Sequence, residues 1–110
     1  MSYPLTNGAF RLGTVQNLTV ASAAGAAVST AVFGAQTYAI RVTFPGVVTS
    51  TGGVRVKIAS TAVAPVASST ADALLAFNVV EYLKVNPGER LSAISNDAGT
   101  PTLNITELTA

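Results

Sequence analysis

Short runs of alternating apolar and polar residues, each ended by a turn signal, constrain this chain more than any other feature. Over residues 36–44, Tyr38, Ile40, Val42 and Phe44 alternate with smaller or polar residues. A period of two is typical of a strand with one buried face. The pattern predicts a strand that ends at the following Pro-Gly pair and buries all four side chains, Tyr38 included.

The same pattern recurs along the chain. Val54, Val56 and Ile58 alternate with Arg55 and Lys57, which predicts a second strand with its charges outward. Further strands are expected at residues 15–20, 28–33, 79–85, 90–95 and 102–108. Seven or so short strands at spacings of about ten residues favour an all-β fold over a parallel α/β sheet. We expect one antiparallel β-sandwich or jelly-roll-like domain of about seven to eight strands.

The clearest turn signal is Asn86-Pro87-Gly88-Glu89. Pro87 pre-sets φ for the second turn position, and Gly88 tolerates the positive φ that the next position needs. The sequence therefore predicts a hairpin here, extended by the strand at 102–108 into a three-stranded meander. Residues 70–77 are the one plausible helical turn, with Asp72 as its cap, but an irregular crossover between sheets is an equal alternative.

A single domain, residues 10–110, is expected to follow an N-terminal arm, residues 1–9 (MSYPLTNGA), which has no strand pattern. The arm could be a loose terminus or could be held by a neighbouring subunit. Residues 12–40 carry no charge, yet their many polar and small residues argue against a membrane span. The start of the chain also lacks a secretory signal, so we expect a protein made and kept in the cytoplasm.

Composition excludes several kinds of chemistry. The chain has no cysteine and no histidine, which removes thiolate catalysis, cysteine zinc sites and the commonest general base. Six basic and five acidic residues give a net charge of +1, and the basic residues are scattered, so nucleic acid and anionic membrane are poor partners. Charged residues make up only 10% of the chain and the mean hydropathy is +0.50. Part of the surface is therefore expected to contact protein.

No enzyme signal survives inspection of the remaining polar residues. A glycosidase pair could combine Glu81 with Glu89 or Glu107, but we expect all three carboxylates to be exposed and solvated. A Ser/Lys dyad would rest on Lys57 or Lys84, both expected to point outward. The loop at 96–100 offers too few oxygen ligands for calcium and is interpreted as a turn. We expect no catalytic, cofactor-binding or metal-binding residues.

Sugar binding is a separate possibility, because jelly rolls often bind glycans through aromatic side chains. The chain has no tryptophan, and Tyr3, Tyr38 and Tyr82 are far apart in the sequence. The number and spacing of the aromatic residues therefore give little support to a sugar-binding function.

The C-terminal third carries a family resemblance. The segment VVEYLKVNPGERLSAIS, followed by GTPTLNITEL, resembles small β-structured virion proteins encoded among the head and tail genes of tailed bacteriophages. Members of that group often contain a hairpin of the form E-Y-hydrophobic-x-V-x-P-G and a last strand reading L-N-[IV]-T-E. These motifs are structural, and residues 1–70 carry no such resemblance.

The resemblance implies a capsid decoration, or cement, protein. Such a protein binds the outer surface of the major capsid protein, is located on the virion after synthesis in the host cytoplasm, and needs no cofactor. A homo-oligomer, dimer or trimer, is expected, and a tail or head-to-tail accessory subunit is the alternative. The contact residues expected for this role are Tyr3, Pro4, Leu5 and Phe10, with Arg11 pairing to capsid acids.

Overall fold

The structure is a computed structural model that describes residues 10–45, 52–66 and 72–109. These residues form eight β-strands and no helix, which confirms the expected all-β fold. The strands are β1 (Arg11–Thr19), β2 (Val28–Ser29), β3 (Ala39–Thr43), β4 (Val54–Ala59), β5 (Ala73–Leu75), β6 (Glu81–Lys84), β7 (Arg90–Ser95) and β8 (Thr102–Thr109). The predicted arm, residues 1–9, lies outside the described residues.

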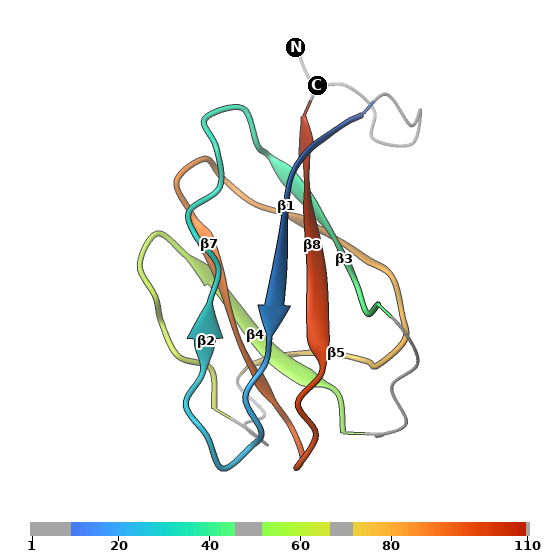
Figure 1. Ribbon diagram of the computed structural model, residues 1–110. Coiled ribbons are helices and arrows are strands. Elements are labelled where there is room, and N and C mark those ends of the chain that lie inside the picture. The colour runs from blue at the N-terminus through green and yellow to red at the C-terminus, as the bar shows by residue number, and fades with distance from the viewer. Residues whose placement is uncertain (1–9, 46–51, 67–71, 110) are drawn as a thin grey trace.

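The strands form two four-stranded antiparallel sheets, sheet A in the order β1-β8-β3-β6 and sheet B in the order β2-β7-β4-β5 (Figure 1). The first strand pairs with the eighth, the second with the seventh, the third with the sixth and the fourth with the fifth. This is the pairing expected for two Greek keys wrapped into an eight-stranded jelly roll. Consecutive strands therefore lie in different sheets, except for β4 and β5.

The core lies between the sheets and follows the predicted alternation. Ile40 and Val42 of β3, and Val54 and Val56 of β4, are almost completely buried. The rest of the buried cluster comes from both sheets and the connections between them: Val20, Phe33, Leu75, Val85, Leu91, Ala93, Leu103 and Ile105. Burial of these side chains is the main favourable contribution to folding of the domain.

The prediction that Tyr38 is buried in the core is wrong, because its side chain is 58% exposed. It lies one residue before β3, and its carbonyl accepts a hydrogen bond from the Val85 amide at 3.0 Å. Alternation decides the face of a residue only within the body of the sheet. At the sheet's end the interior of the sandwich no longer covers the ring. Phe44, one residue after β3, is half-buried and packs edge-to-face on Phe77 with ring centroids 5.6 Å apart.

The turn at residues 86–89 is present, but it does not form a hairpin. Gly88 has a φ of +83°, as its position requires, and the Glu89 amide donates to the Asn86 carbonyl at 3.1 Å. However, β6 pairs with β3 in sheet A, whereas β7 pairs with β2 and β4 in sheet B. The predicted hairpin and meander are therefore wrong. β6 and β7 both bury one face in the core, but β6 does so as part of sheet A and β7 as part of sheet B.

The same turn holds the connection between β2 and β3. The Phe33 amide donates to the Glu89 carbonyl at 2.7 Å, and the Gly88 amide donates to the Phe33 carbonyl at 3.0 Å. The Thr30 amide likewise donates to the Leu91 carbonyl at 2.9 Å. Residues 30–33 thus stay bonded to the chain around β7 without forming a strand, so the strand predicted at 28–33 is confirmed only at Val28–Ser29.

The helical turn predicted within residues 70–77 is wrong for the part that the structure describes. Residues 73–75 form β5, which pairs with β4, and Asp72 accepts a hydrogen bond from the Val66 amide at 2.8 Å instead of capping a helix. After β5 the chain passes from sheet B to sheet A, and Asn78 adopts a φ of +61° on the way. The alternative interpretation, an irregular crossover over residues 70–77, holds only for residues 76 and 77, which begin the connection from β5 to β6.

Two glycines with positive φ give a matched test of the fold. Gly53 (φ +76°) and Gly88 (φ +83°) both adopt the left-handed region, but a Cβ at Gly53 would lie 2.7 Å from the Leu75 carbonyl oxygen, whereas one at Gly88 would meet nothing within 4 Å. We expect Gly88→Ala to lower the free energy of unfolding by about 1 kcal/mol through backbone strain alone. Gly53→Ala adds a clash with β5 and should lower it by about 2–3 kcal/mol. Urea unfolding measures both, and equal losses would contradict the close approach of β5 to Gly53.

Candidate docking face

Glu107 is the one carboxylate whose position departs most from expectation. It was expected in solvent, but its side chain lies inside the sandwich and is 5% exposed. Its Oε1 accepts hydrogen bonds from the Gly34 amide at 2.9 Å and from the Thr37 hydroxyl. Glu107 thus fixes the connection between β2 and β3 against β8. Leu103, Ile105 and Glu107 alternate in β8, so strict alternation was the signal that could have placed it inside.

Asp72 is the second buried carboxylate, and its partners are also structural. Its Oδ1 lies 3.2 Å from the Lys57 Nζ, and the Arg55 guanidinium donates to its backbone carbonyl at 3.0 Å. Lys57 is half-exposed, so its predicted outward direction is confirmed, but it is engaged with an acid of its own chain. This ion pair ties β4 to the start of β5.

Of the remaining acids, Asp97 and Glu89 lie in turns, and Glu81 lies on β6 at the edge of sheet A. Asp97 accepts from the Gly99 amide at 2.8 Å and from the Gly52 amide at 3.2 Å, and Glu89 accepts from the Asn86 amide at 2.6 Å. These bonds agree with a turn at residues 96–100, and no group of three acidic residues in the described part of the chain could hold a metal ion. Glu81 and Glu89 are half-buried, so neither matches the fully exposed carboxylate expected.

The outer face of sheet A differs from these regions in having no acid. Since Ile40 and Val42 point into the core, Ala39 and Arg41 point away from it. Residues directly opposite each other in an antiparallel pair share a face. One row across the sheet is therefore Leu12, Leu108, Ala39 and Lys84. The next row is Val15, Thr106, Arg41 and Tyr82. We call these two rows the outer face.

A bulge in β1 brings two apolar side chains onto this face. The register shifts between Leu12 and Val15, so that three positions on β1 span two on β8. The extra residue places both side chains on the outer face instead of on opposite faces. Leu12 is 74% exposed and Val15 50% exposed, and Tyr82 on β6 is 62% exposed. Tyr82 lies three strands away from Leu12 and Val15, because β1 and β6 are the two edges of sheet A. The outward residues between these edges, Leu108, Thr106 and Ala39, are buried, so the outer face is exposed mainly at its two edges. Leu12 and Val15 form an exposed apolar pair of the kind that is typical of a contact surface.

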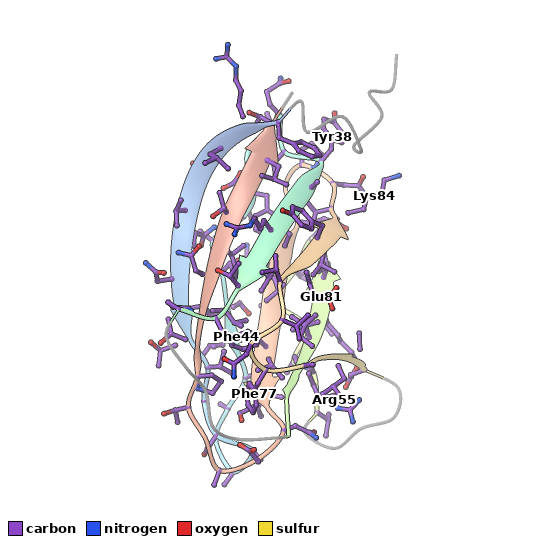
Figure 2. All side chains as sticks on the ribbon, turned by 90° about the vertical axis from the view of Figure 1, so that its right-hand side faces the viewer. Tyr38, Phe44, Arg55, Phe77, Glu81 and Lys84 are labelled. Atoms are coloured by element: carbon purple, nitrogen blue, oxygen red, sulfur yellow. The ribbon has the colours of Figure 1, made fainter. Side chains whose placement is uncertain are left out.

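The cations of the outer face have no acid to pair with. The side chains of Arg41 and Lys84 form no hydrogen bond or ion pair with any described residue, in contrast to those of Lys57 and Arg55 on sheet B. Figure 2 shows Lys84 extending from the ribbon at the end of the sandwich where Tyr38 lies, and Phe44 and Phe77 further along. The outer face thus combines apolar side chains with two available positive charges.

The contact residues proposed from the sequence only partly meet this face. Tyr3, Pro4 and Leu5 lie outside the described residues. Phe10 is half-buried, and Arg11 is exposed at the start of β1, opposite Thr109 and next to Leu12. The cluster of Arg41, Tyr82 and Lys84 was not predicted from the sequence, because it depends on β3 pairing with β6 across some 40 residues of chain.

Comparisons with models of protein families, with curated proteins and with solved structures give no match to this chain. Within residues 10–45, 52–66 and 72–109, no helix is long and apolar enough to cross a bilayer.

Proposed function

We propose that this protein is a capsid decoration protein of a tailed bacteriophage, which binds the outer surface of the major capsid protein lattice and stabilises the shell. The observation that carries the proposal is the outer face of sheet A, which exposes Leu12 and Val15 at its β1 edge and Tyr82 at its β6 edge, where two cations without an acid partner lie beside it. A surface of this kind suits protein contact better than catalysis. The resemblance of residues 79–108 to small phage virion proteins suggests that the assembly which this surface contacts is a phage particle.

The size of the outer face favours many weak contacts over one strong one. The whole outer side of sheet A, four strands at a spacing of about 4.8 Å by the eight residues of β8 at about 3.3 Å each, covers roughly 500 Å², and the two rows of the outer face are only part of it. A stable interface of ordinary size buries about 800 Å² on each partner. One copy bound through this face alone would be held weakly. A dimer or trimer bound across neighbouring capsid subunits would gain affinity by avidity.

Stabilisation of the shell would then follow from mass action. A protein that binds the assembled lattice more tightly than free capsid protein shifts the equilibrium towards the lattice. The decoration protein would be made in the host cytoplasm and would end on the capsid surface.

A sugar-binding module is the second candidate, and one observation favours it. Tyr38 and Tyr82 are both more than half exposed, on adjacent strands β3 and β6 or at their ends, and exposed aromatic rings are a common means of stacking on sugars. Such a module should retain affinity for a glycan as a free domain. A decoration protein should bind shells and no glycan.

Copy number in purified virions tests the proposal directly. We expect quantitative mass spectrometry to find this protein in a ratio to the major capsid protein of one, or of a simple fraction of one. A decoration protein follows the capsid lattice, so its copies should number in the hundreds. A few copies per particle would support the tail or head-to-tail alternative, and absence from virions would contradict a structural role.

A further inference from the structure

We infer that Arg41, Tyr82 and Lys84 form a binding site for carboxylates of a partner protein, so that the surface on which the outer face docks is acidic. The inference rests on the proposed function, since it names the chemistry of the partner that the outer face would meet. It depends on where β3 and β6 place these three side chains.

The register of β3 and β6 brings the three residues together. Tyr82 lies directly opposite Arg41, and Lys84 lies opposite Ala39, two residues further along each strand. All four point away from the core, because Ile40 and Val42 between them are buried. Arg41 and Lys84 are therefore diagonal neighbours, at a typical separation of about 7–8 Å.

The charge around this cluster is unbalanced. Like charges on neighbouring strands are unfavourable, and no acid lies in either row of the outer face. Four of the five acids are engaged elsewhere, Glu107 and Asp72 in the interior and Glu89 and Asp97 in turns. The fifth, Glu81, faces the core side of β6, because it lies opposite Val42.

The three groups suit a carboxylate. The guanidinium of Arg41 presents paired donors that match the two oxygens of a carboxylate, the ammonium of Lys84 adds a second positive charge, and the Tyr82 hydroxyl can donate one more hydrogen bond. Leu12 and Val15 at the β1 side of the same face would contact an apolar patch beside those acids. Partner carboxylates would relieve the repulsion between the two cations and steer the encounter.

The first test uses shells of the encoding phage from which this protein has been removed, and measures binding by co-sedimentation. We expect Lys84→Gln to weaken binding about tenfold and the double variant Arg41→Gln/Lys84→Gln about a hundredfold, with the difference shrinking at high salt. Lys57→Gln is the charge control, since it removes the same charge from sheet B, away from the outer face, and its binding should stay within about threefold of the wild type. Because this substitution also breaks the pair with the buried Asp72, it should lower the unfolding temperature, and binding is compared at a temperature where every variant is folded. Thermal unfolding of each variant checks that the fold is kept.

The outcomes separate the inference from the proposed function. If Leu12→Ser/Val15→Ser abolishes binding while the double cation variant binds as the wild type does, the face docks without carboxylates and the inference is overturned alone. If the wild type does not bind shells, the proposed function fails.

A second measurement tests the carboxylate-binding site even if the protein does not bind shells. Titration of the ¹⁵N-labelled protein with a ten-residue glutamate peptide should shift the amide signals of Arg41, Tyr82 and Lys84, and the double variant should lose the effect. No shift at these residues, or saturation by a heparin fragment at a lower concentration than by the peptide, would overturn the assignment to protein carboxylates.

Discussion

Phe33→Ala should lower the free energy of unfolding by about 3–5 kcal/mol, the usual cost of deleting a buried aromatic side chain. The Phe33 side chain is 2% exposed and belongs to the main core cluster. Its backbone is bonded on both sides to the turn at residues 86–89, so the surrounding structure has little freedom to collapse into the cavity. For a domain of this size, whose total stability is typically about 5–15 kcal/mol, this is a large fraction.

Urea unfolding followed by circular dichroism measures this loss. Val32→Ala is the matched control, because Val32 is the preceding residue and is half-exposed, and it should change stability by less than about 0.5 kcal/mol. Equal effects of the two substitutions would show that residues 30–33 do not insert Phe33 into the core.

Glu107→Ala should have the second largest effect, a loss of about 3–4 kcal/mol, because it leaves the Gly34 amide and the Thr37 hydroxyl without their common acceptor in a buried site. Thr37→Val removes one of the two donors and should cost about 1–2 kcal/mol. In the double variant the two losses should not add, since both substitutions break the same hydrogen bond. The coupling energy is expected to be about 1.5–3 kcal/mol.

Glu81→Ala serves as the control for removing a glutamate. The side chain of Glu81 is half-buried on the edge strand β6 and forms no hydrogen bond or ion pair with a described residue, so its loss should cost well under 1 kcal/mol. Additive losses for Glu107→Ala and Thr37→Val would contradict the direct bond between them.

Local features of the sequence predicted much of this fold. Alternation located β3 and β4 and their inward side chains, because a period of two reports which face of a strand is buried. β7 was located by the turn signal that precedes it. The turn at residues 86–89 was predicted from proline and glycine chemistry, and Gly88 has the positive φ expected of it. Each of these properties depends on a few adjacent residues.

Alternation could not say which strand lies beside which. β6 and β7 were expected to pair across four turn residues, yet they belong to different sheets. A strand's pattern fixes its buried face and leaves its neighbours open. The helical turn expected near residue 72 failed for a related reason, since the three residues of β5 acquire strand structure only by pairing with β4.

The sequence by itself determined an all-β chain with few charged residues and without histidine or cysteine. Only the tertiary structure decided that Glu107 bonds to Gly34 and Thr37, that Tyr38 is exposed, and that Arg41, Tyr82 and Lys84 form one cluster on an acid-free face. These facts depend on contacts between residues 40 to 70 positions apart, such as the one between Thr37 and Glu107. An alternating pattern depends only on residues adjacent in sequence, whereas contacts between distant residues depend on how the two sheets pack around one core.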